Sequence, residues 1–428
     1  MIRSRRYLVL LVLAAVLGVP ISALAYGFLQ LVHSVQTWLY TDLPGGLGFH
    51  GMPTWWPVVP LAIAGPLVAA TIRWLPGTGG EVPLEGFRPG TPEVAYLPGI
   101  AIAAIISIAL GPVVGPEAPL IALGGGVGAL VARLLRRVPE QAYPLIAATG
   151  SFAAVSTLLG SPIVGAFLLI EVTGLTGAAA TLALVPGLLG AGIGTLIFTG
   201  LGRWTGHGLF SLALPDLPAI SRPTAAELGW AVVIGVLAVP LAFGIRRLAG
   251  LVAPFVETRR MLVTTAAGLA VAGLAIGYAY ATGHPVAEVL FSGQDQLPGF
   301  VQQRAAYSVG ALLLLIVCKG LAYSLCLVCF RGGPTFPAMF LGTVGGLALS
   351  HLPGLAPIPA MAMGVGAMSV AILRLPFTCT LLATVFFGHD GLTLAPVIII
   401  AVVVAHVGML RFTPPPPEPP PDGSADDR

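Results

Sequence analysis

Apolar stretches separated by short polar connections run through almost the whole chain of 428 residues. Several of them are shorter than the roughly 20 residues that a helix needs to cross a bilayer. The pattern therefore predicts an all-α integral membrane protein with many tilted or broken helices. The runs are Tyr7–Leu39, Trp55–Leu75, Leu97–Leu110, Leu120–Leu135, Ala142–Leu159, Pro162–Thr173, Ala179–Leu201, Leu228–Leu248, Leu262–Ala281, Ala305–Phe330, Phe336–Leu352, Ile358–Leu373, Phe377–Phe387 and Leu392–Leu410.

Composition excludes a soluble globule. Hydrophobic residues make up 56% of the chain and charged residues only 9%, with a mean hydropathy of +0.95, which leaves too little polar surface for a protein of this size. The 56 Gly and 39 Pro are scattered through the apolar runs. We expect most of these glycines to allow close helix packing and most prolines to kink helices.

Two Gly/Pro turns at membrane depth are the exceptions. The first is Gly115-Pro116-Glu117-Ala118-Pro119, and about 218 residues later a similar turn reads Gly333-Pro334-Thr335-Phe336-Pro337. An ionisable side chain inside a membrane is a functional candidate by default. Broken helices in matching halves of a chain favour an ion site between them.

The two halves share one plan. At the 218-residue offset, Leu123, Gly124 and Gly128 also align with Leu341, Gly342 and Gly346, and at an offset of about 214 Pro162 meets Pro376. We predict repeats at about 55–201 and 228–410. The sequence leaves a parallel and an inverted relation open, and we favour inversion because half-helix ion sites recur in inverted repeats.

The turns favour an anion. Pro116 and Pro119 leave several amide N–H groups without helical partners, and such helix N-termini carry about half a positive charge. Phe336 and Phe340 are expected to supply apolar walls beside the second turn. Glu117 can occupy the place of the anion and act as a gate that protonation releases. Alternatively, Glu117 caps its own helix.

These pieces together resemble the CLC family of chloride channels and proton-coupled chloride exchangers, over roughly residues 6–410. Gly115 to Pro119 is similar to the family's Gly-Arg/Lys-Glu-Gly-Pro turn, whose glutamate gates the pore, and Gly333 to Pro337 to its Gly-x-Phe-x-Pro anion-site turn. Lys319 matches a lysine in the helix before that turn. Gly160–Gly165 with Phe167–Glu171 resembles the helix that carries Ala-Pro-Leu-x-Gly and ends in Glu.

The resemblance implies a CLC-type fold in two inverted repeats and a set of site residues. It implies Glu117 as the gate and Glu171 as a candidate for the proton path. The expected anion-binding and pore residues are Thr78, Gly79, Gly80, Val82, Gly115, Pro116, Ala118, Pro119, Gly333, Pro334, Thr335, Phe336 and Pro337.

The chain also departs from the family pattern. Where the family turn has Gly-Ser-Gly-Ile-Pro, the segment Gly77–Pro83 places either Thr78 or Gly80 at the serine position. Glu171 is followed by Val172, whereas exchangers of the family commonly have a second acid there. The pore tyrosine of the last membrane helix has no evident match. Glu85, Glu93 or a water chain remain substitutes for the inner proton step.

We therefore predict transmembrane transport of chloride or a similar anion, most simply by a channel gated by Glu117, with a proton-coupled exchanger as the alternative. The resemblance implies a homodimer in the lipid bilayer. We expect no enzyme, no cofactor, no metal site and no nucleic-acid partner. The histidines show no His-Glu-x-x-His spacing, and Cys326 and Cys329 have no second pair.

Charge placement predicts the topology. Net charge is +3, and Lys319 is the only lysine. The arginines before the first apolar run predict a cytoplasmic N-terminus. The pairs at 136–137, 246–247 and 259–260 fall between apolar runs and predict cytoplasmic loops. We expect an uncleaved first helix, a membrane domain at 1–412, and a Pro-rich, disordered cytoplasmic tail at 413–428 without a regulatory domain.

Overall fold

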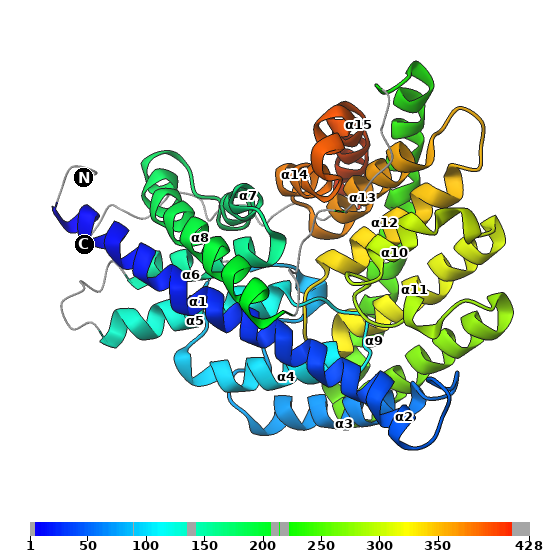
Figure 1. Cartoon of the computed structure of the whole chain (residues 1–428), viewed down its shortest axis with the longest axis horizontal. Helices are drawn as coiled ribbons and strands as arrows, with labels where there is room; N and C mark the ends of the chain where they lie inside the picture. The colour runs from blue at the N-terminus through cyan, green and yellow to red at the C-terminus, as the bar shows by residue number, and fades with distance from the viewer. Residues whose placement is uncertain (1–4, 89, 135–142, 207–213, 215–221, 413–428) are drawn as a thin grey trace, which may run out of the picture.

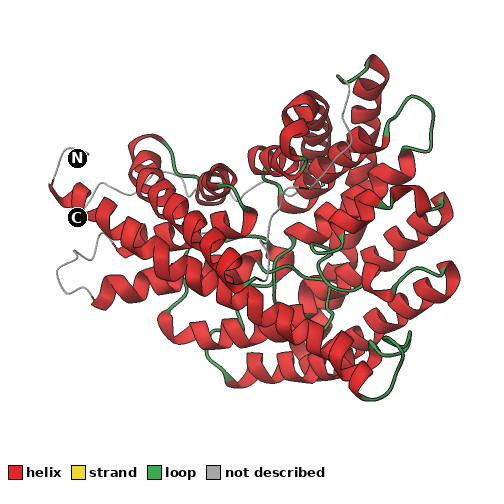
Figure 2. Ribbon diagram, viewed as in Figure 1, coloured by secondary structure: helices red, strands yellow, loops and turns green. Residues whose placement is uncertain are grey.

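The computed structural model describes residues 5–88, 90–134, 143–206, 214 and 222–412, and most of these residues are in helices joined by loops, with no strand among them (Figure 2). The α helices are α1 (Arg5–Thr37), α2 (Leu43–Gly46), α3 (Val58–Trp74), α4 (Leu97–Ala109), α5 (Glu117–Leu134), α6 (Tyr143–Leu159), α7 (Pro162–Thr173), α8 (Gly177–Thr205), α9 (Ala225–Thr282), α10 (Leu297–Gln302), α11 (Val309–Cys329), α12 (Thr335–Leu349), α13 (Pro357–Leu373), α14 (Pro376–Phe386) and α15 (Gly391–Leu410). Short turns of 3₁₀-helix lie at Pro83–Glu85, Val94–Tyr96, Val286–Glu288, Arg304–Ala306 and Gly388–Asp390, and a π-helical turn at Trp38–Asp42.

The predicted mixture of long and short apolar helices is confirmed. Within the described ranges, six helical segments are long and apolar enough to cross a membrane, and the other apolar helices are shorter. Helices α7 and α14 begin at Pro162 and Pro376, as the sequence predicts, because proline is pre-organised for a first helical turn. The chain is thus a multi-pass membrane protein.

Helix α9 combines two predicted runs. Arg259 has non-helical angles, φ −135° and ψ 48°, and interrupts the helix between them. The sequence predicts a loop at Arg246–Arg247, but the structure places this pair within α9. Its position, about 32 Å along the helix from Ala225, is close to the thickness of a bilayer core, so the pair still suits a membrane boundary.

Some sequence features lie outside the described residues. They are Arg3, Arg136, Arg137, His207 and the tail at 413–428.

The two predicted repeats have matching helix pairs. In the first, a Cβ on Gly124 of α5 would lie 2.5 Å from the Gly150 carbonyl oxygen of α6; in the second, a Cβ on Gly342 of α12 would lie 2.2 Å from that of Gly364 in α13. Glycine is needed at these positions because the helix backbones touch. In Figure 1, α5, α6 and α8 lie toward the left end of the long axis, and α12 to α15 lie on the other side of the molecule.

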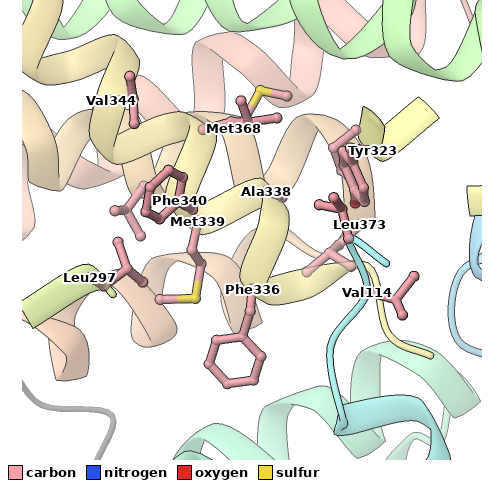
Figure 3. Close-up of a cluster of buried hydrophobic side chains, with 14 of the residues drawn as sticks. Val114, Leu297, Tyr323, Phe336, Ala338, Met339, Phe340, Val344, Met368 and Leu373 are labelled. Carbon is pink, nitrogen blue, oxygen red and sulfur yellow. The ribbon is translucent and has the colours of Figure 1, made fainter. Parts of the chain in front are cut away.

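The core is centred on α12. Phe336, Met339 and Phe340 have no exposed surface, and Figure 3 shows them among side chains from neighbouring helices, including Tyr323 of α11 and Met368 of α13. Burying this helix on all sides fixes the position of its N-terminus, which bears Thr335.

Candidate functional site

The two Gly/Pro turns meet and hydrogen-bond to each other. The Gly115 N–H donates to the Gly333 carbonyl at 2.8 Å, and the Gly333 N–H donates to the Gly115 carbonyl at 2.6 Å, in an antiparallel bridge. This reciprocal pair is what a two-fold relation between the turns requires. A Cβ on Gly115 or Gly333 would fall 2.1 or 2.0 Å from carboxyl atoms of Glu117, so both glycines make room for that side chain.

Glu117 lies between the two turns. Its side chain is 1% exposed, although it opens α5, and its Oε1 accepts a hydrogen bond of 2.5 Å from the Thr335 N–H. That bond crosses from α5 to α12, which a carboxylate that only caps its own helix would not do. Among the described residues, its Oε2 has no hydrogen-bond partner.

Proline spacing leaves a similar pair of amides without helical partners at each helix start. In α12, Thr335 and Phe336 occupy the first two positions, and Pro337 at the third has no N–H. In α5, Glu117 and Ala118 precede Pro119, and the Leu120 N–H makes a bond to the Pro116 carbonyl. Both helix ends are therefore positively polarised and suited to an anion.

Two cavities approach Glu117 from different sides. The larger, of about 420 Å³, is lined by Ala118 and Pro119 and by Thr78 to Val82. The smaller, of about 220 Å³, is lined by Pro116 together with His33, Tyr40 and Asp295. Because the chain neighbours of Glu117 line different cavities, the turn that carries this residue lies between the two cavities.

The Gly77–Pro83 turn forms one wall of the larger cavity. Gly77, Thr78, Gly79 and Gly80 have φ of 85°, 50°, 70° and 94°, a left-handed run that favours glycine. Thr78 and Gly80 both line the cavity, so either can occupy the position of the family serine. Val82 lines it as well.

Three contacts that support this site are absent from the sequence prediction. Arg331 donates from its backbone N–H to Ser107 Oγ at 3.0 Å and from Nε to the Thr78 carbonyl at 3.2 Å. The Tyr323 hydroxyl donates to the Pro334 carbonyl at 2.6 Å and holds the second turn from behind. The sequence signal that could have revealed these contacts is Arg331, a charged residue two positions before Gly333 in an apolar region.

Other predicted residues lie away from the two cavities. The Lys319 Nζ donates to the carbonyls of residues 288–291 at 2.9 to 3.3 Å and lies 4.4 Å from the centre of the Phe340 ring. It anchors a loop. Phe336 and Phe340 belong to the core and, like Thr335, are not among the residues lining either cavity, so their role as walls stays a prediction.

Glu171 caps a helix of the other repeat. Its two carboxyl oxygens accept the N–H groups of Phe377 at 2.9 Å and Thr378 at 2.6 Å, at the start of α14. Val172 lines the larger cavity, as does Glu85, which pairs with Arg88 at 3.0 Å. Glu93 is not among the residues lining that cavity.

The family model described as "Voltage gated chloride channel" matches residues 83–408. Among curated proteins, the chain is 30% identical to YfeO of Escherichia fergusonii, over 82% of this chain and 81% of that protein. It is 29% identical to YfeO of Escherichia coli strain SE11, over the same shares. The names of both relatives describe them as ion-transport proteins.

Solved structures share the fold. A slow cyanobacterial Cl⁻/H⁺ antiporter matches with a TM-score of 0.76 and 20% identity, over 96% of this chain and 95% of that chain. A CLC-type fluoride/proton antiporter matches with a TM-score of 0.71 and 18% identity, over 93% and 94%. The chain therefore has the overall helical fold of these proteins.

Proposed function

We propose that this chain, which belongs to the voltage-gated chloride channel family, conducts chloride or a similar small anion across the membrane through a pathway that Glu117 gates. The observation that carries the proposal is the Glu117 carboxyl group on the Thr335 amide, between two cavities. A carboxylate there occupies the position that the helix N-termini offer to an anion.

Opening requires the carboxyl group to leave the Thr335 amide. An anion arriving in the larger cavity competes with the carboxylate for the positive ends of α5 and α12. Protonation of Glu117 weakens its bond to that amide, because hydrogen bonds to charged acceptors are about twice as strong as neutral ones. Anion concentration and acidity are thus both expected to favour the open pathway.

Passive conduction is the simpler form of this mechanism. Val172 lines the larger cavity where a second acid would pass protons inward, and Glu171 beside it has both oxygens occupied by backbone amides of α14. With both oxygens engaged in this helix cap, Glu171 has a structural role, and Val172 offers no acid to pass protons inward.

A proton-coupled exchanger is the second candidate, and one observation favours it. The Glu117 Oε2 is buried without a hydrogen-bond partner among the described residues. A buried charged oxygen without a partner is costly, whereas a protonated carboxyl group is cheaper to bury. A carboxyl group between two cavities that alternates between these states can carry a proton from one to the other.

Reversal potentials distinguish the two. Purified protein in planar bilayers under opposed chloride and proton gradients is expected to reverse at the chloride equilibrium potential alone. A reversal potential that moves with the proton gradient, or uphill proton movement driven by chloride in proteoliposomes, would establish the exchanger instead.

Glu171→Gln tests the inner proton step separately. Under the channel hypothesis we expect anion flux within about twofold of wild type, and unfolding destabilised by about 1 kcal/mol because the α14 cap is weakened. Flux assays and thermal unfolding in detergent measure the two effects. Loss of proton-driven anion movement in a variant that folds normally would assign Glu171 to the proton path.

A further inference from the structure

One buried cation in the larger cavity has no role in the mechanism above. Arg331 is 3% exposed and lines the cavity beside Gly332. Its guanidinium donates from Nε to the Thr78 carbonyl and from Nη1 to the Phe330 carbonyl, each at 3.2 Å. Its Nη2 makes no hydrogen bond to the described part of the chain.

Arg331 forms no ion pair with any residue that the structure describes. The ion pairs within the described ranges join Arg88 to Glu85, His284 to Glu288 and His389 to Asp390, so no carboxylate lies within 4.0 Å of this guanidinium. Carbonyl dipoles solvate a cation but do not neutralise it. A buried charge without a partner is expensive, and at membrane depth it marks a binding position.

The remaining charged groups of the cavity compensate this charge only in part: Glu85 attracts Arg331 from beyond ion-pair distance, while Arg260 repels it. Glu81, Glu85 and Arg88 also line the cavity, but all three are exposed, and Arg88 is occupied by Glu85. Water and salt screen exposed charges. Arg331 is buried and stands only two residues before Gly333, whose turn encloses Glu117.

We propose that Arg331 binds a small monovalent inorganic anion in the larger cavity, at a site separate from the Thr335 amide. One positive charge without an ion-pair partner matches one negative charge, and the free Nη2 supplies a donor. The role of this site rests on the proposed function: an anion bound at Arg331 would move from there to the helix N-termini when the Glu117 gate opens. Arg331 and Gly333 are two residues apart, at most about 7 Å along the chain, so the Arg331 backbone lies close to the turn before the α12 N-terminus.

The binding itself can be tested without transport. Crystals of the purified chain grown in bromide are expected to show an anomalous peak beside the Arg331 guanidinium while Glu117 remains on Thr335. In calorimetric titrations with bromide, Arg331→Met is expected to weaken binding at least about tenfold, because a charge-assisted contact is lost. Arg88→Met, which removes an exposed and paired guanidinium from the same cavity, should stay within about twofold.

Arg331→Lys covers the case in which the methionine variant does not fold. It keeps the charge but loses the planar fork, so we expect the bromide peak to persist with binding weakened a few-fold. A cavity without a peak in the wild-type protein, or unchanged bromide affinity in a folded Arg331→Met variant, overturns the site.

The two proposals can fail independently. Bromide bound at Arg331 in a protein without anion flux refutes the transport function alone. Flux that depends on Glu117, with no bromide at Arg331, refutes the additional site alone.

Discussion

Glu117→Gln is expected to raise anion flux at neutral pH about tenfold and to flatten its pH dependence. The neutral amide has the shape of the protonated carboxyl group but binds the Thr335 N–H less tightly than a carboxylate does. A charged hydrogen bond exceeds a neutral one by about 1–1.5 kcal/mol, and 1.4 kcal/mol is a factor of ten in population. Acidification protonates Glu117 and opens the gate in the wild-type protein. The glutamine in the variant has no proton to gain, so its flux should not change with pH through this residue.

Chloride efflux from proteoliposomes between about pH 4 and pH 8 measures both effects. Glu81→Gln is the matched control, because it removes an exposed carboxylate from the larger cavity without touching Thr335. Its flux should stay within about twofold of wild type. If Glu117→Gln retains wild-type flux and pH dependence, Glu117 is not the gate; if it ends only proton movement, the exchanger gains support.

The sequence predicted the parts of the site that depend on local chemistry. Proline and glycine mark where a helix starts or breaks, so the turns at Gly115 and Gly333 and the starts at Pro162 and Pro376 could be read from the chain. The repeat then indicated that the two turns belong together. Their hydrogen-bonded pairing confirms that inference.

Contacts between distant segments could not be predicted in this way. Arg331 and Thr78 are 253 positions apart, and no periodic pattern connects them. Lys319 resembles a family residue near the anion turn, yet it binds loop carbonyls because packing directs its long side chain there. The expected loop at Arg246 was wrong because charge was taken to end a helix, whereas α9 continues through it.

The close packing of α12 against α13 leads to a prediction about the stability of the fold. Gly342→Ala is expected to destabilise the fold by about 1–3 kcal/mol, since overpacking a tight interface forces backbone shifts. The added Cβ would lie 2.2 Å from the Gly364 carbonyl oxygen, so α12 must move away from α13. Because α12 bears Thr335 at its start, that movement also displaces the amide that holds Glu117.

Gly345→Ala is the control on the same helix. Its Cβ would meet nothing within 4 Å, and alanine favours a helix over glycine by up to about 1 kcal/mol, so stability should hold or rise. Gly124→Ala, 2.5 Å from the Gly150 carbonyl oxygen in the other repeat, should behave like Gly342→Ala. Thermal unfolding in detergent compares all three. Equal melting temperatures for Gly342→Ala and Gly345→Ala would contradict the close contact between α12 and α13 and the reason for glycine in both repeats.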